Sequence, residues 1–182
     1  LRRGSQTVLF DILVALTKLM APVLSFTAEE IWRMLPESVR ADSKADSVHL
    51  AMFPEVDPRW ADAKLTERWE QLLEVRTAVQ AALEVQRREK VIGAPLEARV
   101  LIDAHSAQYN LLKTYGQDLP AFFIVSDVVL QSAPDLPEKP GFVITVEKAT
   151  GVKCERCWNY RGSVGTSSDH PTLCDRCVEA VR

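Results

Sequence analysis

The sequence predicts an α+β fold in three parts: a helical segment over residues 1–95, a small α+β unit over residues 96–150 and a cysteine-bearing module over residues 151–182. Apolar residues in the first part recur at three- and four-residue steps, as on one face of a helix. Short alternating runs in the second part are typical of strands. All four cysteines lie in the third part, in two Cys-x-x-Cys pairs.

Two helices are predicted near the start of the chain. Residues 8–20 carry one apolar stripe, which we expect to be buried. Residues 27–35 predict a second helix, which begins at a capping box of Thr27 and Glu30 and ends before Pro36. We expect the two to form a helical hairpin.

A loop and a long helix complete the first part. Residues 36–62 are polar and rich in proline, so they predict a loop with at most a short extended segment at 48–50. Residues 64–90 predict the long helix, because apolar and charged positions alternate with helical periodicity. Gly93 and Pro95 follow in the order that ends a helix.

The second part mixes strands with one helix. Residues 96–103, 122–129 and 142–146 predict strands, and residues 108–115 predict a short helix. Residues 149–151 form a hinge to the cysteine-bearing module. These elements suffice for one small α+β unit.

The two cysteine pairs predict a zinc ribbon. Sixteen residues separate the pairs, within the spacing of Cys₄ zinc ribbons. Four thiolates close the tetrahedral shell, so the ion is expected to be structural and His170 a solvated loop residue. The alternatives are two disulfides, which need an oxidising compartment, or a redox pair, which normally sits on a βαβ unit. The predicted ligands are Cys154, Cys157, Cys174 and Cys177.

Cationic and aromatic residues surround the cysteines. They are Lys153, Arg156, Trp158, Tyr160, Arg161 and Arg176. Aromatic rings stack on unpaired bases and arginines contact phosphates, which favours recognition of looped RNA. An equally open alternative is that Trp158 packs on the zinc turns as a miniature core and the arginines are solvated.

A second basic cluster ends the long helix. Arg87, Arg88 and Lys90 could contact nucleic acid, although the helix dipole alone favours cations there. No other constellation competes with these sites, because the three histidines are scattered and no glycine-rich phosphate loop is present.

Composition is that of an ordinary globular chain. The 182 residues include 22 Lys and Arg against 25 Asp and Glu, and the net charge of −3 gives no broad field for nucleic acid. No apolar run is long enough to span a membrane and nothing resembles an export signal, which predicts a cytoplasmic protein. The first residue is Leu1, which predicts a fragment.

Several motifs resemble one enzyme family. Residues 20–32 (MAPVLSFTAEEIW) and 47–50 (SVHL) resemble the anticodon-binding helical domain of class I synthetases for large aliphatic amino acids. Residues 90–98 (KVIGAPLEA) are similar to the segment after that domain. Residues 153–160 (KCERCWNY) and 173–178 (LCDRCV) resemble the C-terminal zinc module of bacterial isoleucyl-tRNA synthetases.

The resemblance implies the C-terminal piece of a tRNA ligase that attaches isoleucine using ATP. The catalytic and editing domains would lie upstream, and ATP would bind only there, because the ATP motifs of the family are absent. The expected partner is the anticodon stem-loop of isoleucine tRNA, with no membrane or DNA partner and a monomeric parent enzyme. The resemblance implies that the four cysteines bind zinc and that Trp158, Tyr160 and Arg156 contact the anticodon.

Two other functions remain to be weighed. Formamidopyrimidine-DNA glycosylases end in a similar zinc ribbon, although nothing upstream of Lys153 resembles them. A purely structural module could instead clip the C-terminus to the helical domain without touching RNA.

Overall fold

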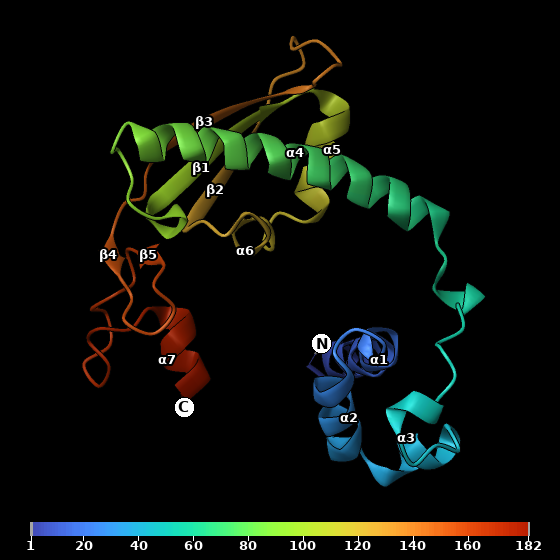
Figure 1. Cartoon of the computed structure of the whole chain (residues 1–182). Helices are drawn as coiled ribbons and strands as arrows, with labels where there is room; N and C mark the ends of the chain where they lie inside the picture. The colour runs from blue at the N-terminus through green and yellow to red at the C-terminus, as the bar shows by residue number, and fades with distance from the viewer. Residues whose placement is uncertain (1, 182) are drawn as a thin grey trace. The chain divides into compact units, whose positions relative to one another are not determined.

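The computed structural model describes residues 2–181 and divides the chain into two compact units, Leu1–Ala61 and Asp62–Arg182 (Figure 1). The predicted α+β class is confirmed. Packing groups the long helix with the sheet in the second unit. The functional boundaries after residues 95 and 150 stay a prediction. Within the described residues, no helix combines the length and apolar character needed to cross a membrane.

The first unit is helical. Its elements are α1 (Arg2–Met20), α2 (Ser25–Met34), α3 (Glu37–Asp42) and the 3₁₀ turns η1 (Val48–Leu50) and η2 (Pro58–Trp60). α1 packs against α2, as the predicted hairpin requires. The core forms around the fully buried Trp32, whose indole N–H donates to the carbonyl of Ala45 at 3.2 Å.

Several details predicted for this unit are wrong. The apolar stripe of α1 stays largely exposed, and Thr17 is the buried residue of that helix. The capping box is wrong, because α2 begins at Ser25 and Thr27 therefore lies within its first turn. Residues 48–50 are a 3₁₀ turn instead of an extended segment, and α3 was not expected.

The second unit is built on a three-stranded sheet. Ahead of the cysteine-bearing tail, its helices are α4 (Ala63–Arg88), α5 (Ser106–Thr114), α6 (Leu119–Phe123) and the 3₁₀ turn η3 (Pro95–Glu97). Its strands there are β1 (Ala98–Ala104), β2 (Asp127–Ser132) and β3 (Phe142–Lys148). The order is β2-β1-β3, with β1 parallel to β2 and antiparallel to β3. The long helix is confirmed, and the Asp62 carboxylate caps its start by accepting from the N–H of Leu65.

One face of the sheet carries the core of this unit. Alternate residues of β1, from Ala98 to Ala104, are fully buried. They pack with one side of α4 and with residues of α5 and α6, and Figure 1 shows α4 lying across the sheet. This packing buries Leu72, Val75, Val79 and Leu83 of α4.

The predicted strand over residues 122–129 is wrong in its first half. Residues 119–123 form α6, which ends because Ile124 adopts a left-handed conformation with φ of 61°. Phe123 points into the core, where it is only 3% exposed. A short apolar run has no period that separates strand from helix, so this packing decided the outcome.

The cysteine-bearing tail follows the sheet. It consists of the short strands β4 (Val152–Lys153) and β5 (Tyr160–Arg161), which pair antiparallel, and helix α7 (Asp175–Val181). Gly151, with φ of 97°, precedes β4, and a Cβ there would come within 2.5 Å of the backbone of Arg161. Only glycine fits this close approach without displacing the backbone.

Candidate metal centre and nucleic-acid interface

The two Cys-x-x-Cys turns bring four sulfur atoms together. Cys154 and Cys157 follow β4, while Cys174 and Cys177 lie at the start of α7. All four sulfurs lie within 4.8 Å of one another, and those of Cys157 and Cys174 are 3.7 Å apart. Tetrahedral zinc with bonds of about 2.3 Å separates its sulfurs by about 3.8 Å. The donor set and its size therefore fit zinc.

Backbone hydrogen bonds shape the first turn. The N–H of Trp158 donates to the carbonyl of Cys154 at 2.8 Å, and the N–H of Cys154 donates to the carbonyl of Asn159 at 2.9 Å. Trp158 itself adopts a positive φ of 65°. The N–H of Cys174 donates to the sulfur of Cys154 at 3.3 Å, and this hydrogen bond connects the second turn to the first.

The thiols differ in their tendency to ionise. Burial opposes ionisation of Cys154, yet the backbone N–H groups of Cys157, Cys174 and Arg156 outweigh it and lower the pKa of Cys154 to about 6. Burial raises the pKa of Cys174 to about 12. Zinc binds thiolates, so metal binding by this cluster must release protons.

A buried hydroxyl connects the tail with the sheet. The Ser126 hydroxyl, just before β2, accepts from the backbone N–H of Tyr160 at 2.7 Å and donates to the carbonyl of Leu96. Tyr160 and Arg161 of β5 are both half-buried.

The predicted RNA contacts near the cysteines have different surroundings. Trp158 is 60% exposed, and the ammonium group of Lys153 lies 5.6 Å from the centre of its ring. The apolar cluster around the sulfurs contains Cys157, Val164 and Leu173 but not Trp158. Arg156 is directed to the metal centre, where its guanidinium donates to the sulfur of Cys177 at 3.8 Å.

The second basic cluster lies at the end of α4. Glu84 binds both arginines: its carboxylate lies 2.9 Å from Nε of Arg87 and 3.5 Å from Nε of Arg88. The Arg87 side chain is the main reason that the pKa of Glu84 is lowered below its ordinary value. Lys90 follows at a positive φ of 61° and is exposed. Nucleic-acid contact by these three residues stays a prediction.

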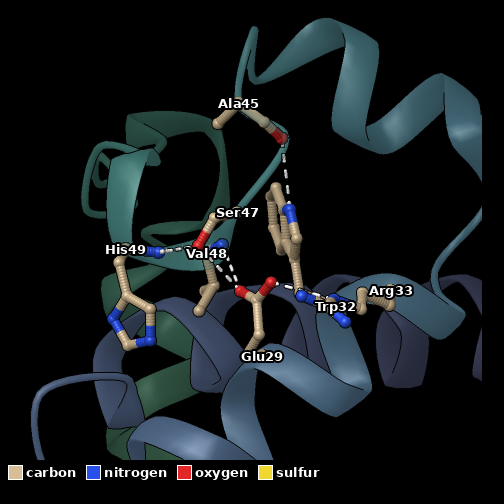
Figure 2. A network of polar contacts seen from close by, with 7 residues as sticks. All are labelled: Glu29, Trp32, Arg33, Ala45, Ser47, Val48 and His49. Atoms are coloured by element: carbon tan, nitrogen blue, oxygen red, sulfur yellow. Dashed lines mark hydrogen bonds and ion pairs between the residues drawn. The ribbon is translucent and has the colours of Figure 1, made fainter.

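A polar network in the first unit was not anticipated from the sequence. Figure 2 shows the Glu29 carboxylate of α2 between Arg33 of the same helix and the backbone segment of Ser47 and Val48. It accepts from the Ser47 hydroxyl at 2.8 Å, from the N–H of Val48 at 3.0 Å and from Arg33 at 3.0 Å. The carboxylate thereby holds η1 on α2. No periodic pattern links positions 18 residues apart, which is why the sequence did not reveal it.

Comparison with known proteins adds two family matches. A family described as the anticodon-binding domain of tRNA ligase matches residues 2–102. A family described as a zinc finger found in FPG and IleRS matches residues 151–180. Together with the clustered cysteines, the second match identifies the cofactor as one structural zinc ion.

Similar proteins named isoleucine–tRNA ligase cover nearly all of the chain. The protein from Syntrophotalea carbinolica is 48% identical over 99% of this chain and 19% of its own length. Those from Geobacter sulfurreducens and Moorella thermoacetica are 45% and 42% identical over 100% of this chain and 20% of their own lengths. The chain thus spans about a fifth of the length of the curated relatives that it matches.

Proposed function

Because this chain belongs to the family of anticodon-binding domains of tRNA ligases, we propose that it holds the anticodon stem-loop of isoleucine tRNA. The whole protein would then be an isoleucine–tRNA ligase of the cytoplasm, active as a monomer, with ATP bound in a separate catalytic domain. The names of the relatives support this specificity.

The proposed zinc ligands are Cys154, Cys157, Cys174 and Cys177. Their four sulfurs match the size of a tetrahedral shell and leave no position for a substrate. When bound, zinc supplies coordination bonds that stabilise the two turns.

Exposure of Trp158 is the observation that carries the RNA-binding role. A tryptophan that served as a miniature core would be buried against the sulfurs, but Trp158 is 60% exposed. Lys153 adds a positive charge beside the ring. An exposed aromatic ring next to a cation suits a splayed-out base and its phosphate. Tyr160 and Arg161 lie in the adjoining strand β5.

The arginines at the end of α4 extend this proposal. Arg87 and Arg88 share one carboxylate, so at least part of their positive charge remains available to phosphates, together with that of Lys90. These contacts would position the RNA without reading its sequence.

A DNA glycosylase is the less favoured alternative. The zinc-finger family includes FPG as well as IleRS, so the tail alone does not distinguish them. The match over residues 2–102 favours a tRNA ligase.

Binding to RNA arms tests the proposed function. The full chain is titrated with the isoleucine anticodon arm, with an arm of the same stem but another anticodon, and with duplex DNA, at several salt concentrations. We expect the isoleucine arm to bind most tightly, with an affinity that falls as salt rises. Equal binding of all three at physiological salt would contradict the proposal.

A further inference from the structure

Arg156 reaches across the metal centre. It belongs to the first Cys-x-x-Cys turn, yet its Nη1 atom donates to the sulfur of Cys177 in the second turn, 21 residues along the chain, at 3.8 Å. Cys177 is fully buried. Arg156 is therefore a side-chain link between the two turns.

Other cations near the site are placed differently. Lys153 lies over the ring of Trp158, and Arg161 lies in β5 near the carboxylate of Asp175. Arg176 occupies the same place in the second turn as Arg156 does in the first. Within residues 2–181, the Arg176 side chain forms no hydrogen bond or ion pair and donates to no sulfur.

The charge of the site explains why such a donor matters. Four thiolates around a divalent ion carry a formal charge of about −2. Buried charge is costly unless hydrogen bonds compensate it. The backbone N–H of Cys174 serves the sulfur of Cys154, while Cys177 receives the charged guanidinium of Arg156. Outer donors of this kind orient a ligand and can change metal affinity about 10–100-fold.

We propose that Arg156 is a positioning residue of the zinc centre, whose guanidinium neutralises the sulfur of Cys177 and ties the two Cys-x-x-Cys turns together. This role rests on the proposed Cys₄ ligand set. It differs from the anticodon-contact role that the sequence suggested for Arg156, because the contact that the structure shows for this guanidinium is with a zinc-site sulfur. Trp158 retains its proposed role.

Zinc release from the full chain tests this role. Wild type, Arg156→Ala, Arg156→Lys and the matched control Arg176→Ala are purified, their zinc content is measured, and each is mixed with excess chromogenic chelator. We expect Arg156→Ala to release zinc about tenfold faster than wild type. Arg156→Lys should be intermediate, since it keeps the charge but loses the planar fork, and Arg176→Ala should match wild type.

Two outcomes would overturn the inference. One is release at the wild-type rate from both Arg156 variants. The other is weaker binding of the isoleucine anticodon arm by these variants with unchanged zinc release, which would restore the RNA-contact role. Wild-type protein without zinc would overturn the ligand set itself. If Arg156→Ala is unfolded after purification, the zinc-release rate of Arg156→Lys alone tests the proposal: a rate equal to that of wild type would overturn it.

Discussion

The hydroxyl of Ser126 accepts a 2.7 Å hydrogen bond from the backbone N–H of Tyr160, 34 residues further along the chain. The same hydroxyl donates to the carbonyl of Leu96, and Ser126 is only 2% exposed. One side chain therefore joins β5, which carries proposed RNA contacts, to the segment that leads into the sheet.

Replacing Ser126 with alanine should destabilise the second unit. Ser126→Ala leaves the N–H of Tyr160 and the carbonyl of Leu96 without their partner, which we expect to cost about 1–3 kcal/mol. Native-state hydrogen exchange of the β1 amides measures the change. Ser132→Ala, at an exposed position in β2, is the control and should be nearly neutral. Equal hydrogen-exchange protection of the β1 amides in Ser126→Ala and Ser132→Ala would contradict the prediction.

Glu29→Gln should flatten the dependence of stability on pH in the first unit. The hydroxyl of Ser47, followed by the N–H of Val48, lowers the pKa of Glu29 below its ordinary value. A lowered pKa stabilises the fold above the unfolded value of about 4.3, and this contribution is lost as pH falls through the folded-state pKa. Wild type should therefore exceed Glu29→Gln in stability at pH 7, with the difference narrowing below about pH 4.

Denaturation at pH 3–7, followed through the NMR signal of the Trp32 indole N–H, measures this effect. Glu30→Gln removes a neighbouring charge outside the network of Figure 2 and is the control. A stability difference between wild type and Glu29→Gln that does not change with pH would rule out the carboxylate as its cause.

Cys174→Ser should lose zinc and unfold the tail. In modules this small, metal binding supplies folding free energy, so the loss of one ligand removes both. Metal analysis gives the zinc content, and hydrogen exchange of β4 and β5 reports the fold. His170→Ala should keep its zinc, because His170 lies outside the four-sulfur cluster. Full zinc content in Cys174→Ser would refute the ligand assignment.

Trp158→Ala should weaken RNA binding without changing zinc content. Stacking of a base on an aromatic ring contributes about 1–3 kcal/mol, so the affinity for the isoleucine anticodon arm should fall about 5- to 150-fold. Titration of the full chain measures this change. Trp60→Ala removes another exposed tryptophan, 68% exposed and outside the tail, and should have less effect. Unchanged affinity with intact zinc would favour a purely structural tail.

Local signals predicted some elements well. The helix expected over residues 64–90 is α4 (Ala63–Arg88), because its periodicity and end signals lie within the segment itself. The predicted strand over residues 142–146 lies within β3 (Phe142–Lys148). The predictions failed where distant contacts decide. Residues 48–50 form η1, which Glu29 caps from 18 and 19 residues away, and residues 119–123 form α6 against the core.

The sequence by itself determined the kind of metal site. Two Cys-x-x-Cys pairs at this spacing specify four soft ligands, and that chemistry needs little beyond the turns themselves. Only the tertiary structure decided what the neighbouring side chains do. It directs Arg156 to Cys177 and brings the Ser126 hydroxyl to the backbone N–H of Tyr160, while Trp158 stays exposed. Spacing along a chain describes local geometry, whereas these contacts join residues 21 and 34 positions apart that only packing brings together.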